Sequence, residues 1–211
     1  MKYTSLIALF TMLYIGVKGQ SHLIGVKSGF SWTNISSNSR DYIIQNNFIA
    51  GITYDYKVYK NLSLGCEFLF EERGGNISVS FNDANGNLEE HYTIPYEYNY
   101  LSLPIKLSYT FGDIFFGYGS IGFCPAILKK ATVTYPEGYL VHFVDPFLTI
   151  QPTYSEYDLA GLGEIGIGYK FKDRFSINMS ARFQHSFTSL IENEGERNFG
   201  TTFGLGLKYY L

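Results

Sequence analysis

Strict alternation of apolar and polar residues recurs in eight segments of this chain. Successive side chains of a β-strand point to opposite faces, so a period of two indicates strands with two chemically different faces. The cleanest segment, residues 175–184, reads FSINMSARFQ. The other seven lie at 24–32, 48–56, 62–71, 101–109, 114–124, 159–171 and 199–211. No apolar run beyond residue 20 approaches the roughly 18 residues of a membrane-spanning helix, so the mature chain could cross a membrane only as a closed barrel.

The size of the side chains on each face indicates which face is inside. The lumen of an eight-stranded barrel is only just wide enough for side chains to fill, so its inward face should carry small residues. Here the small residues, chiefly Gly and Ser, lie on the polar face, whereas Phe, Tyr, Leu and Ile lie on the other. An apolar outer face and a polar inner face are typical of a transmembrane barrel. The facing of 114–124 stays open, because Gly117, Gly119 and Gly122 fall on both faces. A soluble or secreted eight-stranded ligand-binding barrel is the alternative, and it would need its apolar residues inside.

The lengths of the connections support the membrane interpretation. Short connections at 57–61, 110–113 and 172–174 alternate with long ones at 33–47, 72–98, 125–157 and 187–197. Bacterial outer-membrane barrels have short periplasmic turns and long extracellular loops. The sequence therefore predicts an all-β fold, an eight-stranded antiparallel up-and-down transmembrane β-barrel with long extracellular loops, in the bacterial outer membrane. Two of the loops should form hairpins, 77–81 with 88–94 and 130–135 with 138–143.

The first residues have the layout of a secretory signal peptide. A cation at Lys2 precedes an apolar run from Leu6 to Val17, and small residues follow near Gly19. The run is too short to span a bilayer, so cleavage after Gly19 or Gln20 is expected. We predict a signal peptide over 1–19 and a single outer-membrane β-barrel domain over 20–211.

Charged residues on the polar faces form the main candidate site. The formal net charge is −3, so no basic patch for a nucleic acid is expected. An unpaired buried ion costs several kcal/mol, so charges enclosed in a narrow lumen must pair. The sequence predicts a lumenal ion-pair network that closes the barrel, built from Lys27, Asp55, Glu67, Glu71, Lys106, Glu164, Lys170, Arg182 and Lys208.

Catalytic, metal and cofactor sites are not predicted. His185 and Ser186, with acids at 192, 194 and 196, could belong to a lipid-modifying outer-membrane barrel enzyme. Adjacent residues of a strand point to opposite faces, which argues against this pair. The other histidines lack the spacing of a zinc site, and no phosphate-binding motif precedes a helix. Cys66 and Cys124 are expected to be free thiols.

Four stretches carry a resemblance to a known family. They are GVKSGFSWTN at 25–34, LSLGCEFLFEERGG at 62–75, YLSLPIKLSYTFG at 100–112 and SINMSARFQHSFTSLI at 176–191. In order and spacing they resemble the PorT-like outer-membrane β-barrel family of Bacteroidota. The resemblance implies an OmpA-type eight-stranded barrel and, for some members, a link to secretion or gliding machinery.

The expected function follows from what each surface can do. The lumen is filled, the outer wall faces outer-membrane lipid, and a rigid barrel exposes its loops. We therefore expect a non-enzymatic, monomeric scaffold with a closed lumen. Its extracellular loops would serve a structural role or bind a protein partner, and neither a cofactor nor a nucleic acid would be involved.

Overall fold

The computed structural model describes residues 22–37, 40–82, 88–135, 154–172, 174–191 and 195–211. The predicted signal peptide and the segment 138–143 lie outside these ranges. All regular structure in the described residues is β, as predicted. The strands are β1 (His22–Ser36), β2 (Tyr42–Ile43), β3 (Gln45–Tyr59), β4 (Leu62–Asn82), β5 (Leu88–Ser102), β6 (Ile105–Gly112), β7 (Phe115–Val133), β8 (Tyr157–Phe171), β9 (Phe175–Ser186) and β10 (Arg197–Tyr210). The described residues contain no helix long and apolar enough to cross a membrane.

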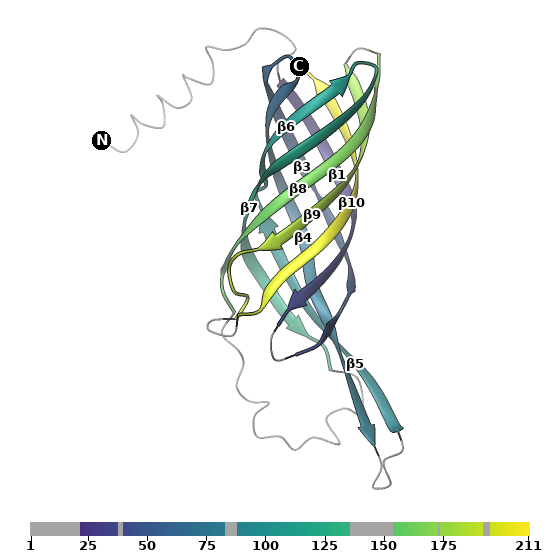
Figure 1. Cartoon of the computed structure of the whole chain (residues 1–211), viewed down its shortest axis with the longest axis vertical. Coiled ribbons are helices and arrows are strands. Elements are labelled where there is room, and N and C mark those ends of the chain that lie inside the picture. Colours follow the sequence, from purple (N-terminus) through teal and green to yellow (C-terminus); the bar gives the residue numbers. More distant parts are fainter. Residues whose placement is uncertain (1–21, 38–39, 83–87, 136–153, 173, 192–194) are drawn as a thin grey trace, which may run out of the picture.

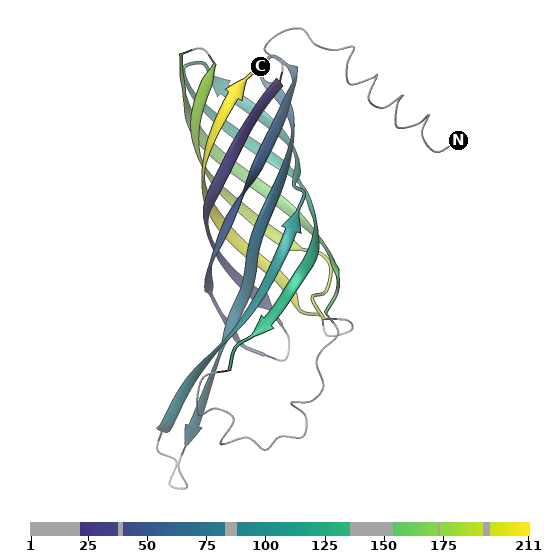
Figure 2. The same ribbon diagram turned by 180° about the vertical axis from the view of Figure 1, so that it is seen from behind.

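The strands close into a ring of eight, as Figures 1 and 2 show. The first and last strands, β1 and β10, pair antiparallel, so the ring has no open edge at this seam. Strands β5 and β6 share one position, because both pair with β4 on one side and β7 on the other. They are separated at Pro104, which has no N–H to give to a ladder. Its carbonyl still accepts a 2.9 Å bond from the Glu67 N–H, and the Leu103 N–H donates to Pro125 at 2.8 Å, so the barrel wall continues across the break.

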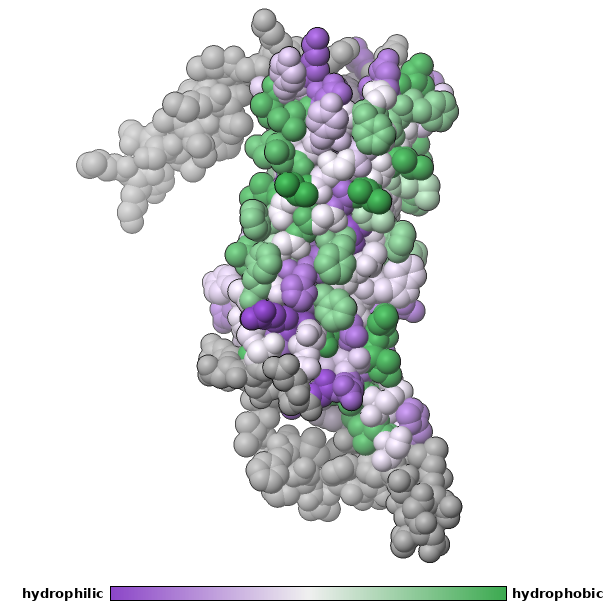
Figure 3. Space-filling view, in the orientation of Figure 1, coloured by the Kyte–Doolittle hydropathy of each residue, from purple (hydrophilic) through white to green (hydrophobic). Residues whose placement is uncertain are grey.

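The two faces of the wall have the polarity that the alternation predicts. Apolar side chains are exposed on the outside, with Phe30 at 67%, Ile121 at 71% and Ile165 at 69%. Figure 3 shows such apolar side chains over the barrel wall. The inside holds charges instead, and the side chain of Arg182 is only 1% exposed. This arrangement suits a barrel surrounded by lipid and is the reverse of a soluble ligand-binding barrel.

The structure of β7 shows which residues of 114–124 face the lumen, a question that the sequence left open. Phe116 and Tyr118 point into the lumen, where they lie directly opposite Gly168 and Gly166 of β8. A Cβ on Gly166 would lie 2.4 Å from the Tyr118 ring, so the glycines make room for the aromatic rings. The expectation that the lumen is lined by small side chains is wrong here. Rings from one strand cover glycines of the next, as aromatic residues often do in sheets.

The connections differ in length at the two ends, and the short turns lie together at one end of the barrel (Figure 1). By the usual rule this end is periplasmic. At the other end β4 and β5 extend as a hairpin, with Ile77 opposite Ile94 and Phe81 opposite Glu90, which confirms the first predicted hairpin. The second predicted hairpin has its second half, 138–143, outside the described residues. Of its first half, residues 131–133 pair with β5 and lengthen the barrel wall.

Candidate functional site: the closed lumen

A cluster of charged side chains crosses the middle of the lumen. Lys106 Nζ lies 2.6 Å from both Glu67 Oε1 and Glu164 Oε1, and Lys27 Nζ lies 2.6 Å from Glu164 Oε2. Arg182 donates from Nε to Glu164 Oε2 at 2.9 Å and from Nη2 to Glu67. Since Glu67 on β4 and Arg182 on β9 are not neighbours in the sheet, their contact spans the barrel. All five side chains are at most 5% exposed.

A second layer of charges lies next to this cluster, on its extracellular side. Arg73 Nη1 lies 2.6 Å from Asp158 Oδ2, and Arg73 Nη2 lies 2.5 Å from Glu71 Oε2. The Arg73 guanidinium also stacks 4.7 Å from the centre of the Tyr100 ring. Glu71 Oε1 lies 3.8 Å from Arg182 Nη1, which joins the two layers.

Together the two layers form what we call the plug, which consists of Lys27, Glu67, Glu71, Arg73, Lys106, Asp158, Glu164 and Arg182. Four cations face four carboxylates, so the plug is neutral as a whole. Charge balance and short contacts are what a buried ion cluster needs, because each unpaired ion would cost several kcal/mol.

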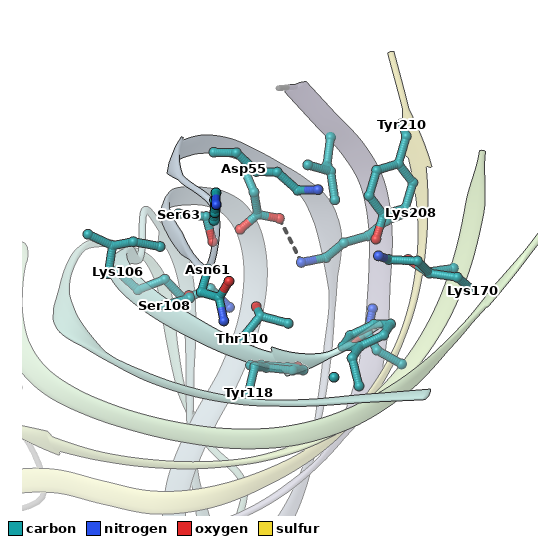
Figure 4. Close-up of a pocket in the computed structure, with 18 residues that line it drawn as sticks. Asp55, Asn61, Ser63, Lys106, Ser108, Thr110, Tyr118, Lys170, Lys208 and Tyr210 are labelled. Carbon is teal, nitrogen blue, oxygen red and sulfur yellow. Dashed lines mark hydrogen bonds and ion pairs between the residues drawn. The ribbon is translucent and has the colours of Figure 1, made fainter. Parts of the chain in front are cut away.

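The other three predicted lumenal residues lie apart from the plug, at the periplasmic end. Lys208 Nζ lies 2.6 Å from Asp55 Oδ2, an interaction drawn in Figure 4. Lys170 Nζ lies 3.4 Å from Asp113, whose side chain is 92% exposed. The nine predicted residues therefore form three groups instead of one network.

Two members of the plug, Arg73 and Asp158, were missed from the sequence. Each has the same parity as a predicted lumenal residue, Arg73 with Glu71 and Asp158 with Glu164. The predicted strands ended at residue 71 and began at residue 159, whereas β4 and β8 continue past these limits. Extending the alternation beyond the membrane-spanning length would have found both residues.

The extracellular mouth is closed by what we call the cap, an apolar cluster of Ile35, Tyr98, Tyr100, Ala126, Leu190 and Ile191. Tyr42 packs against the cap, and its hydroxyl donates to Glu196 at 3.2 Å. Ser37 donates to the same carboxylate at 3.0 Å, so a fully buried acid from the loop before β10 is held by the loop after β1. Burial raises the pKa of Tyr42 above its usual value, so its hydroxyl stays a donor even in alkaline solution. The lumen thus holds packed side chains at two levels, the plug and the cap.

His185 and Ser186 do not form a catalytic pair. Ser186 points inward and donates from Oγ to Asp158 at 2.8 Å, whereas the His185 ring lies beside Phe199, with centroids 6.2 Å apart. In the described part of the chain no three His, Cys, Asp or Glu side chains are placed to hold a metal ion. Cys66 and Cys124 are both free, as predicted.

Comparison with known proteins decides the family. Residues 19–192 match the family described as outer membrane protein beta-barrel domain. The chain belongs to this outer-membrane β-barrel family. Its place is accordingly the outer membrane, as the sequence predicted. No curated protein matches the chain.

Two solved structures have the same fold as this outer-membrane barrel. Neisserial surface protein A is 10% identical, with a TM-score of 0.56 over 90% of this chain and 97% of that one. The outer membrane protein OprG from Pseudomonas aeruginosa is 11% identical, with a TM-score of 0.54 over 92% of this chain and 97% of that one. At these identities the likeness concerns the fold alone.

Proposed function

We propose that this outer-membrane barrel is a non-enzymatic scaffold with a closed lumen, and that it presents its extracellular β4–β5 hairpin to a protein partner. The observation that carries the proposal is the contrast between the two parts of the molecule. The lumen is filled by the plug and the cap, whereas the hairpin extends beyond the barrel (Figures 1 and 2).

The middle of the lumen offers no open path to an ion or solute passing through. An eight-stranded barrel has no spare width, and here Lys106, Glu164 and Arg182 reach one another across it. A steady water column would require these contacts to open. The outer wall faces lipid and has to stay apolar, because a Lys or Arg at the bilayer midplane would cost about 2–4 kcal/mol. Recognition on the extracellular side is therefore left to the loops.

The hairpin carries two strand edges that could bind another chain. Strand β2 pairs with β4 only at Asn76 and Ile77, and β7 pairs with β5 only as far as Tyr96. The Thr134 N–H donates to the Pro95 carbonyl at 3.3 Å, and beyond Ile77 and Pro95 the described sheet contains no third strand beside the hairpin. Free edges accept an added strand through main-chain hydrogen bonds. Ser78 and Ser80, which both contact His91, are exposed there.

The resemblance to PorT-like proteins suggests a class of partner. Four stretches covering 25–34, 62–75, 100–112 and 176–191 carry that resemblance. We propose a component of a secretion or gliding machinery as the first partner to test.

The test is a shortened hairpin. Replacing residues 79–92 by Asn-Gly joins Ser78 to Thr93, which lie opposite each other, through a two-residue turn that keeps the strand register. A photo-crosslinker at position 43 or at position 133, near the base of the hairpin, reports nearby proteins in whole cells. We expect discrete protein adducts in the full-length chain and their loss in the shortened one, with unchanged folding.

The control is a S78A/S80A variant, which removes the exposed hydroxyls and leaves both strand edges in place. It should keep the adducts, because main-chain edges carry the proposed binding. Adducts that survive the shortened hairpin, or lipid adducts alone, would contradict the proposal.

A further inference from the structure

A cavity of about 100 Å³ lies at the periplasmic end of the lumen, opposite to the cap. Figure 4 shows residues that line it. We call it the vestibule. Its inner end is formed by Lys106 of the plug, and its outer rim includes Lys60 and Asn61 of the β3–β4 turn. The volume exceeds that of one water molecule several times over. The vestibule is therefore a blind pocket that opens toward the periplasm.

Cations outnumber carboxylates around the vestibule. Lys57, Lys60, Lys170 and Lys208 line it, together with the single carboxylate of Asp55, which already pairs with Lys208. The four lysines come from β3, the β3–β4 turn, β8 and β10, so positive charge enters the pocket from several sides.

Two of these ammonium groups lie over one aromatic ring. Lys57 Nζ is 5.1 Å and Lys170 Nζ is 5.6 Å from the centre of the Tyr210 ring. Among the described residues, no carboxylate comes within 4.0 Å of Lys57, and the partner of Lys170 is an exposed aspartate. Tyr210 is half-buried, and a cation over such a ring gains about 0.5–2 kcal/mol, which leaves the positive charge of both lysines without a counter-ion.

An unpartnered donor adds an independent observation. Ser176 lines the vestibule and is fully buried, yet its Oγ has no hydrogen-bond partner among the described residues. A buried hydroxyl without a partner is unfavourable by about 1–3 kcal/mol, so such groups usually meet a bound water or ligand. Asn178, on the same strand as Ser176, and Thr110 of β6 also line the pocket with polar groups.

We propose that the vestibule binds a small tetrahedral oxyanion, namely a phosphate group, either free or as a monoester on a larger periplasmic molecule. Lysine binds phosphate as a point charge, and an anion with several oxygens can meet ammonium groups from β3, β8 and β10 together. The Ser176 hydroxyl supplies a neutral donor to the same group. This site goes beyond the scaffold role and does not depend on it, because it lies at the other end of the barrel.

The experiment uses the folded full chain in detergent at constant ionic strength. Inorganic phosphate, glycerol 3-phosphate and acetate are titrated separately by calorimetry, with chloride as the replaced anion. We expect phosphate to bind, and acetate to bind at least about tenfold more weakly because it has one charge and two oxygens. Binding of glycerol 3-phosphate as well would show that a phosphate on a larger molecule is accepted, whereas its absence would restrict the site to the free ion.

Variants locate the site. K57Q/K170Q should weaken phosphate binding by about tenfold or more, and S176A by a few-fold, because each removes groups proposed to contact the phosphate. K129Q/K130Q makes the same change of charge at the extracellular end of β7, where both lysines are exposed, and should bind as the unaltered chain does. If K57Q/K170Q does not fold, S176A, which keeps every charge, decides the matter.

The proposal is overturned if phosphate does not bind, if acetate binds equally well, or if K129Q/K130Q weakens binding as much as K57Q/K170Q. Binding unchanged in both S176A and K57Q/K170Q would likewise place the anion elsewhere.

Discussion

Replacing Arg182 by Met tests the plug most sharply. The Arg182 guanidinium contacts three carboxylates, those of Glu67, Glu164 and Glu71, and its side chain is 1% exposed. Met fills a similar volume but removes the charge, so the plug would hold three cations against four carboxylates. Breaking a buried pair typically costs about 3–5 kcal/mol.

The loss in free energy of unfolding caused by R182M should fall at the lower end of this range. Lys27 and Lys106 still contact Glu164, and Lys106 still contacts Glu67, so neither acid loses every partner. We expect a loss of about 3 kcal/mol in the free energy of unfolding, or more than a hundredfold in the unfolding equilibrium. Urea unfolding in lipid vesicles measures it, with the fluorescence of Trp32, the single tryptophan, as the probe. Trp32 is 45% exposed on the lipid-facing side of β1, so its emission should change when the barrel leaves the lipid.

Two further variants separate charge balance from simple loss of contacts. K170Q removes a cation whose partner Asp113 is exposed, and it should cost less than about 1 kcal/mol. R182M/E67Q restores three cations against three carboxylates in the plug. It should be more stable than the sum of its single variants predicts, by about 1 kcal/mol or more. An unfolding midpoint of R182M equal to that of the unaltered chain, or strict additivity in the double variant, would refute the charge-balance reasoning.

Three other outcomes are expected. G166A should destabilise the barrel by about 1–3 kcal/mol in the same unfolding assay, because its Cβ would meet the Tyr118 ring, whereas G163A, on the same strand with open space around it, should change stability little. Y42F removes a donor to the buried Glu196 carboxylate and should speed hydrogen exchange of the cap amides without affecting those of the barrel wall, and equal exchange would show that this bond does not hold the cap. In cell fractions the protein should sediment with the outer membranes, and recovery from the aqueous fraction without detergent would contradict the membrane assignment. The purified protein should migrate faster on a cold SDS gel than after boiling.

Much of the wall was predictable from the sequence because one rule governs it. In β9 every side chain from Phe175 to Phe183 faces as the alternation requires, since lipid outside and charge inside leave no other choice. The rule fails where side chains carry no polarity. Gly117 and Gly119 face outward and Gly122 faces inward, and only the aromatic rings of β7 reveal which is which.

The partners within the plug were less predictable than its members. Arg182 meets Glu67 across the lumen, and that meeting depends on the tilt and stagger of the strands, which the alternation does not specify. The burial of Glu196 could not be predicted from the sequence, for another reason. It lies in a loop, and its burial depends on how Ser37 and Tyr42 fold over the mouth.

Single-channel recording in a planar bilayer tests the central claim, that the lumen is closed, most directly. The purified barrel should insert without producing steady conductance steps, because the plug and the cap both block the path through an eight-stranded ring. R182M/E67Q removes the ion pair between Arg182 and Glu67 across the lumen while keeping the plug neutral, so it is the variant best placed to leak. Stable, reproducible steps from the unaltered chain would contradict a closed scaffold.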